Sequence, residues 1–243
     1  MSVRVTLATT RRVLLQLRHD PRTIALLLVV PCVLVTLIKY VFSGSDVFDR
    51  IGVPLLGVFP LLSMFLVTSI AMLRERTTGT LERLLTMPVA KLDLLLGYAL
   101  AFAAIAVAQA TLLTIVAFGA LDLHVDGSKA GVIAFATANA VLGMALGLFV
   151  SAFARTEFQA VQFLPAFILP QVLLCGLVTP RADMSHALEL ASWVAPMTYA
   201  YTALDHVGRG EYGATLAGYA LALAGFTLGA LVLGATTLRR RTA

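Results

Sequence analysis

Charged residues are scarce in this sequence: Asp, Glu, Lys and Arg together make up 13% of its 243 residues. Hydrophobic residues make up 59%, and the mean hydropathy is +0.91. Several apolar runs exceed the roughly 18 residues that indicate a membrane-spanning helix. The composition therefore predicts an integral membrane protein.

Residues that would support catalysis or a cofactor are also scarce. Cys32 and Cys175 both lie inside apolar runs, where a packing role is expected rather than a disulfide or a metal site. The four histidines show no metal-binding spacing such as His-Glu-x-x-His. No Gly-x-x-x-x-Gly-Lys-Ser/Thr motif occurs, so the chain lacks a P-loop for ATP phosphates. We predict that it binds no cofactor and is not an enzyme.

Carboxylates are absent from the middle of the apolar runs, because every Asp and Glu falls in a predicted loop or at the edge of a span. Proton-coupled transporters usually carry an intramembrane carboxylate. The sequence therefore disfavours a proton-coupled secondary efflux transporter, which we keep as an alternative.

Six apolar runs are long enough to cross a hydrocarbon core of roughly 30 Å as helices. The predicted spans are Thr23–Phe42, Ile51–Leu73, Leu94–Ala120, Ala130–Phe153, Phe158–Thr179 and Gly213–Leu238. We expect one all-α transmembrane domain over residues 1–243, with a preceding helix at 1–22, the spans within 23–238 and a basic tail at 239–243.

The basic residues predict the orientation. With both termini inside, thirteen of them are cytosolic: Arg4, Arg11, Arg12, Arg18, Arg22, Arg74, Arg76, Arg83, Lys91, Arg155, Arg239, Arg240 and Arg241. Four are outside: Arg50, Lys129, Arg181 and Arg209. This bias follows the positive-inside rule, so the net charge of +5 indicates topology in a cell membrane rather than binding to nucleic acid.

The segment before the first span has an apolar arc bordered by arginines. Val3, Leu7, Val13, Leu14 and Leu17 share one side of a helical wheel, and arginines recur every seven residues along its border. This pattern predicts an amphipathic helix in the inner membrane interface. A frayed basic tail that only sets topology is the alternative.

The segment Arg74–Pro88 joins spans two and three and is rich in charge. Gly79-Thr80 can end one helix and start another, Pro88 can end the second, and the second helix has an apolar stripe at Leu81, Leu84 and Leu85. A short amphipathic helix flanked by charges is suited to docking into a groove on a soluble partner. A solvated connecting loop is the alternative.

Spans four and five and the connection after span five also carry signals. Gly143 and Gly147 form a Gly-x-x-x-Gly pair that favours close helix packing within the chain, and Pro165 and Pro170 predict a kink in span five. The connection from span five to span six is apolar and contains Trp193. It predicts an outer amphipathic helix or re-entrant hairpin, with a plain extracellular loop as the alternative.

Two of these regions resemble the ABC-2 family of ABC-transporter permeases. The first is Glu75-x-x-x-Gly79-Thr80-x-Glu82-x-Leu84-x-x-x-Pro88. The second comprises Arg155 to Gln162, then Pro165, Pro170, Gly176, Pro180 and the run Trp193-Val-Ala-Pro196-Met-Thr-Tyr199. The chain most resembles the short drug-exporting permeases of actinobacteria, such as the daunorubicin permease type.

The resemblance implies a bacterial exporter subunit that works as a homodimer, or as a heterodimer with a sister permease, on two copies of a separate ATPase that holds ATP and Mg. It implies that Glu75, Gly79, Thr80, Glu82, Leu84 and Pro88 couple to that ATPase. By the same analogy, spans two and five line a substrate path with candidate residues Phe65, Gln159, Gln162, Phe163 and Phe167; ordinary packing is their alternative role. The expected cargo is a drug-like amphipathic molecule or a lipid, and the alternative is a lipid-linked polysaccharide.

Overall fold

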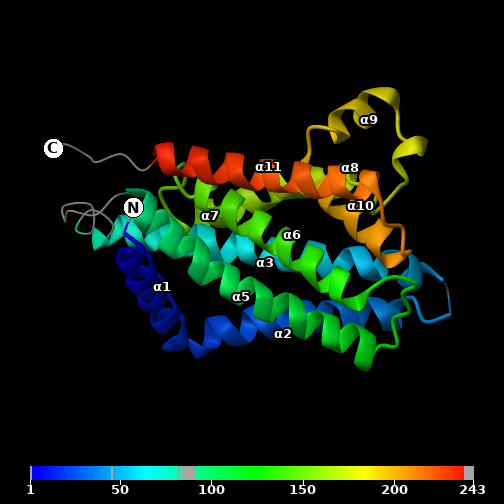
Figure 1. Ribbon diagram of the computed structural model, residues 1–243, viewed down its shortest axis with the longest axis horizontal. Coiled ribbons are helices and arrows are strands. Elements are labelled where there is room, and N and C mark those ends of the chain that lie inside the picture. The colour runs from blue at the N-terminus through cyan, green and yellow to red at the C-terminus, as the bar shows by residue number, and fades with distance from the viewer. Residues whose placement is uncertain (1, 45, 81–82, 84–90, 238–243) are drawn as a thin grey trace.

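The computed structural model describes residues 2–44, 46–80, 83 and 91–237, and every regular element among them is helical (Figure 1). The helices are α1 (Val3–Arg18), α2 (Pro21–Val41), α3 (Val47–Thr77), α5 (Lys91–Gly119), α6 (Lys129–Val150), α7 (Glu157–Phe163), the π-helical turn η1 (Leu164–Ile168), α8 (Leu169–Leu174), the 3-10 turn η2 (Arg181–Asp183), α9 (His186–Ser192), α10 (Pro196–Gly208) and α11 (Ala214–Thr237).

Six candidate membrane spans are present in the described residues, in agreement with the sequence. They are α2, α3, α5, α6, the continuous stretch α7–η1–α8, and α11. Most of their bounds lie within a few residues of those predicted, but the fifth ends at Leu174 instead of Thr179. A helix satisfies its own backbone hydrogen bonds, which explains why apolar runs of this length form helices.

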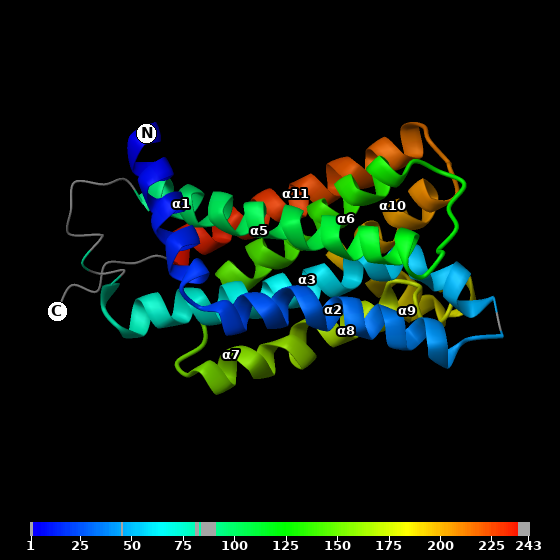
Figure 2. The same cartoon turned by 90° about the horizontal axis from the view of Figure 1, so that it is seen from below.

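The spans run along the long axis of the molecule, with short helices at both ends (Figures 1 and 2). Helix α1 lies across one end, which we call the α1 end; α3 finishes there, and α5 and α7 begin there. Helix α9 lies at the opposite end, called the α9 end. The two ends therefore carry different accessory helices.

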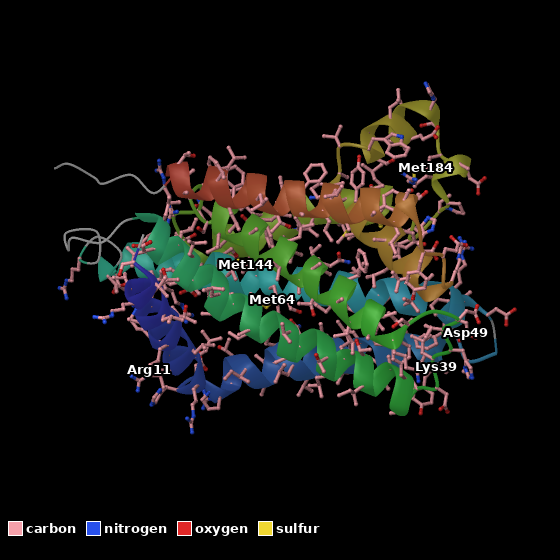
Figure 3. The ribbon with its side chains drawn as sticks, in the orientation of Figure 1. Arg11, Lys39, Asp49, Met64, Met144 and Met184 are labelled. Carbon is pink, nitrogen blue, oxygen red and sulfur yellow. The ribbon has the colours of Figure 1, made fainter. Side chains whose placement is uncertain are left out.

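Helices α3 and α6 form the centre of the bundle. A Cβ atom added at Gly143 would lie 2.2 Å from the carbonyl oxygen of Leu61, and one at Gly147 would lie 2.5 Å from that of Phe65. The side chains of Met64 and Met144 are buried near the middle of the bundle (Figure 3). The two glycines thus let the backbones of α3 and α6 approach closely, which confirms the expected role in packing within the chain.

Span five is interrupted where its prolines predict. Pro165 lies in the π-helical turn, and Pro170 lies in the first turn of α8. A proline lacks the N–H that the preceding turn needs, and a wider π turn is one way of accommodating the loss. By contrast, Pro31 in α2 and Pro54 in α3 lie inside helices that continue past them.

Two helices, α9 and α10, connect span five to span six, so the plain-loop alternative is wrong. Helix α10 packs against α3, α6 and α11 and buries Met197, Ala200 and Leu204. The buried amide of Gln171 on α8 accepts a hydrogen bond from the backbone N–H of Met197 at 3.4 Å. This bond satisfies a donor in the first turn of α10 and joins that helix to span five.

Candidate functional site

Helix α1 is docked firmly on the first turns of α5. A Cβ atom at Gly97 would lie 2.5 Å from the Cβ of Thr9, so the two helices touch at this glycine. The hydroxyl of Thr10 donates to the carbonyl oxygen of Gly97 at 3.1 Å, and the backbone N–H of Ser2 donates to the buried carboxylate of Asp93 at 2.9 Å. The frayed-tail alternative for this segment is therefore wrong.

One part of the apolar arc of α1 packs against the bundle, and the other part is exposed. Val13 is buried in a cluster with residues of α3 and α5, and Leu14 and Leu17 pack at its margin. Val3 and Leu7 are exposed. The buried part holds α1 against the bundle, and contact of the exposed part with the membrane interface stays a prediction.

The guanidinium of Arg12 on α1 joins the ends of two spans. It donates to the carboxylate of Glu75 on α3 at 3.1 Å and to the hydroxyl of Tyr98 on α5. The Tyr98 side chain is buried, whereas the Arg12 and Glu75 side chains are 29% and 12% exposed. This mostly buried cluster fixes α1, α3 and α5 relative to one another.

The preceding residue of α3 makes a second ion pair. Arg74 donates to both carboxylate oxygens of Glu157, the first residue of α7, at 2.6 and 3.2 Å. This pair is exposed, with side-chain exposures of 59% and 52%. Consecutive residues at the end of span two are thus joined to α1 on one side and to span five on the other.

A cleft of about 420 Å³ lies between α1, α3 and α5 beside these pairs, and its lining includes Gln16, Asp20, Glu75 and Tyr98. Asp20 caps α2: its carboxylate accepts from the hydroxyl of Thr23 at 2.6 Å and from the backbone N–H of Thr23 at 3.2 Å. These bonds favour the charged carboxylate and hold the pKa of Asp20 below its ordinary value of 3.8.

Helix α3 ends at the predicted break. Gly79 has φ +71°, a left-handed conformation that glycine adopts without a steric penalty. The backbone N–H of Arg83 donates to the carbonyl oxygen of Gly79 at 3.0 Å, and both Thr80 and Arg83 have helical backbone. The other three coupling candidates, Glu82, Leu84 and Pro88, lie outside the described residues.

The five path candidates lie on α3 and along span five. The ring of Phe65 is fully buried and stacks on that of Phe167, with centroids 6.5 Å apart and planes 11° apart. Phe163 is half-buried against α3, while Gln159 and Gln162 are exposed on α7. The structure therefore places the candidates where spans two and five meet, but Phe65 and Phe163 pack inside this chain. A role for these residues in a substrate path stays a prediction.

Sequence reasoning missed the residues that join the helices at the α1 end. In the sequence, Arg12 is only a topology signal and Tyr98 has no predicted role. Arg74, also a topology signal, and Glu157 enter only as parts of longer segments, Arg74–Pro88 and Arg155 to Gln162. Their partners are 63 to 86 residues away in the chain, so helix periodicity gives no indication of the pairing. A charged residue directly at the end of an apolar run was the only available signal.

A bundle of six long apolar helices is the architecture of a polytopic α-helical membrane protein. The charged cluster at the α1 end then lies where span two leaves the bundle. The sequence model of the ABC-2 type transporter family matches residues 4–207, and the chain belongs to this family.

Two relatives illustrate the similarity. The Escherichia coli K12 protein YbhR, named a probable multidrug ABC transporter permease, is 29% identical over 148 residues, which are 60% of this chain and 39% of that protein. The Dictyostelium discoideum ABC transporter G family member 20 is 26% identical over 141 residues, which are 58% of this chain and 19% of that protein. The matched part thus spans less than half of the length of either relative.

Proposed function

We propose that the chain is the membrane-spanning permease subunit of an ABC exporter, driven by a separate ATPase subunit that holds ATP and Mg. Family membership supports the transporter class. The observation that carries the coupling role is the pair of adjacent ion pairs, Arg12–Glu75 and Arg74–Glu157, four to five residues before the break at Gly79.

The α1 end faces the cytosol in this proposal. Among the described residues, it carries the arginines of α1 together with Arg74, Arg76 and Arg155. Such an excess of basic residues is typical of the cytosolic side of a membrane protein. The partner ATPase therefore meets this end, and both termini lie on the same side.

Movement of the ATPase is transmitted through the end of α3. The partner contacts the segment that follows Gly79, where the resemblance places Glu82, Leu84 and Pro88. A displacement of that segment pulls on consecutive α3 residues, and these are held to α1 and α7 by ion pairs. The force therefore reaches the interfacial helix and span five together, which a solvated loop would not achieve.

The substrate path runs beside spans two and five in a dimer of permeases. The exposed amides of Gln159 and Gln162 and the exposed ring of Phe167 offer mixed polar and apolar contacts along span five, although the amide oxygen of Gln159 also accepts a hydrogen bond from the backbone N–H of Arg155. This mixture suits a hydrophobic or amphipathic drug-like molecule or a lipid, which is the proposed cargo. The name of YbhR, a probable multidrug permease, supports the same class.

Co-purification and one substitution test the coupling. A tagged chain isolated from its source cells should retain an ATPase subunit, and Glu82→Ala should reach the membrane normally but lose export and substrate-stimulated ATP turnover. A charge pair left half-formed at a desolvated contact costs about 2 to 5 kcal/mol, whereas an exposed pair costs below about 1 kcal/mol. Glu82→Gln should be milder.

The matched control is Glu189→Ala, which removes a half-exposed carboxylate from α9 at the opposite end of the molecule. It should export normally. Normal export by Glu82→Ala at matched expression would show that the coupling role assigned to Glu82 is wrong.

A further inference from the structure

Three arginines from three elements line one pocket at the α9 end. Arg50 comes from the first turn of α3, Arg181 from η2, and Arg209 from the end of α10. The pocket has a volume of about 220 Å³, and Asp205 is the one carboxylate among its lining residues. Its lining therefore carries a formal charge of +2 at neutral pH.

The charges in this pocket are not balanced by the residues that line it, although Asp49 and Asp126 line a neighbouring pocket together with Arg50 and Arg209. The carboxylate of Asp205 is already paired with Arg209, at 2.8 Å. Within the part of the chain that the structure describes, Arg50 and Arg181 have no carboxylate partner, and the buried Nη1 of Arg181 has no hydrogen-bond partner. Guanidinium groups that share a pocket repel one another, so binding of an anion there would be favourable.

The surroundings of the pocket are typical of the depth of lipid headgroups. The guanidinium of Arg181 lies 4.5 Å from the centroid of the Trp193 ring. Trp193 and its neighbours Leu190 and Val194 are exposed. Tryptophan is enriched at the membrane–water boundary because its ring is apolar and its N–H is polar. The stacked arginine therefore lies near that boundary.

The same arginines are exceptions to the charge bias of the chain. Apart from Lys39 in the last turn of α2, four basic residues are predicted on the outer side, and three of them line this pocket. The fourth, Lys129, lies elsewhere, with its ammonium 5.2 Å from the ring centroid of Phe118. Because these three arginines come from separate elements and meet in one pocket, we interpret them as a binding site rather than as residues that set the topology.

We propose that this pocket binds a phosphate group, carried by an outer-leaflet lipid headgroup or present as soluble phosphate. The planar guanidinium group presents paired N–H donors that match two oxygens of a phosphate. A volume of about 220 Å³ admits a phosphate with several waters, because one water takes about 30 Å³. The assignment to the outer leaflet and the departure of these arginines from the charge bias rest on the orientation in the proposed function.

Trp193 is the single tryptophan of the chain and stacks on Arg181, so its fluorescence reports on the pocket. The full chain in micelles of a phosphate-free detergent is titrated with inorganic phosphate in one arm. In a second arm, the same micelles contain increasing fractions of phosphatidylglycerol at constant ionic strength. We expect a saturable change in emission in at least one arm.

Arg50→Gln is the test variant, because it removes a charge from the pocket without touching Trp193. The apparent affinity should fall about tenfold or more, as expected for loss of one charge-assisted hydrogen bond. Lys129→Gln is the matched control, since it removes an outer cation that does not line the pocket, and it should leave the affinity unchanged. Equal thermal unfolding of the two variants shows that both fold.

The two arms distinguish the source of the phosphate. Saturation with inorganic phosphate assigns a soluble ligand, and saturation with phosphatidylglycerol alone assigns a lipid headgroup. Absence of a saturable response in both arms would overturn the proposal. Equal affinities for Arg50→Gln and Lys129→Gln would overturn it as well, because the response would then reflect general surface charge.

Discussion

Removing the guanidinium of Arg12 should destabilise the chain more than removing any exposed arginine near it. In Arg12→Gln, the Glu75 carboxylate loses its ionic partner while its side chain remains 88% buried, given its exposure of 12%. The matched control is Arg11→Gln on the same helix. The side chain of Arg11 is exposed on the surface of α1 that faces away from the bundle (Figure 3).

The expected magnitude follows from distance and burial. Two unit charges 3.1 Å apart attract by about 5 kcal/mol at an effective dielectric constant of about 20. Desolvation offsets much of this attraction, and loss of one partner costs about 3 to 5 kcal/mol for buried pairs and below about 1 kcal/mol for exposed ones. The hydroxyl of Tyr98 also lies within hydrogen-bonding reach of the Glu75 carboxylate and can still donate to it. We therefore expect about 2 to 3 kcal/mol for Arg12→Gln.

The neighbouring pair provides an internal comparison. Arg74 and Glu157 are more than half exposed, so Arg74→Gln should cost below about 1 kcal/mol although its ion pair is the shorter one. For a chain of this length, about 2 to 3 kcal/mol corresponds to a decrease in Tm of about 4 to 12 °C.

Thermal unfolding of the purified variants in one detergent measures these effects. A double-mutant cycle with Glu75→Gln isolates the interaction between Arg12 and Glu75 from other losses. The reasoning is refuted if Arg12→Gln lowers Tm no more than Arg11→Gln, or if the cycle gives an interaction energy near zero.

Three further predictions concern packing, pH and topology. Gly143→Ala places a methyl group against the α3 backbone and should lower Tm by several degrees. The control Gly218→Ala on α11 places its methyl group in open space and should not lower Tm. Equal shifts in Tm would contradict the close contact of α3 and α6. The pKa of Asp20 is depressed in the folded state, so its contribution to stability is present above its ordinary pKa of 3.8 and is lost as pH falls through the lower pKa of the folded state. Asp20→Asn should therefore flatten the decrease of Tm at acidic pH. A cysteine introduced at the exposed position Ser185 should react with an impermeant reagent in intact cells, whereas one at Ser2 should not, and the reverse pattern would invert the proposed orientation.

The spans were predictable because each depends on a local property of the sequence. About twenty apolar residues in succession must form a helix in lipid, whatever lies beside them. The break at Gly79 and the disturbance at Pro165 were predictable for a similar reason, since glycine and proline act on their own backbone.

The buried helix α10 and the charged cluster were not predictable in this way. Helix α10 has 13 residues, too few for a span, and its burial depends on α3, α6 and α11 forming a surface for it. The hydrogen bonds of Arg12 depend on α1 crossing the ends of α3 and α5 at one particular point. Such tertiary arrangements bring together residues that no short window of sequence contains.

The most direct test of the proposed function is transport in proteoliposomes that contain the chain and its co-purified ATPase. We expect outward movement of a fluorescent amphipathic drug that requires ATP and Mg, continues after the proton gradient is collapsed, and is absent when either subunit is omitted. Transport by the chain alone that continues without nucleotide and stops when the proton gradient is collapsed would contradict the account and indicate a secondary transporter.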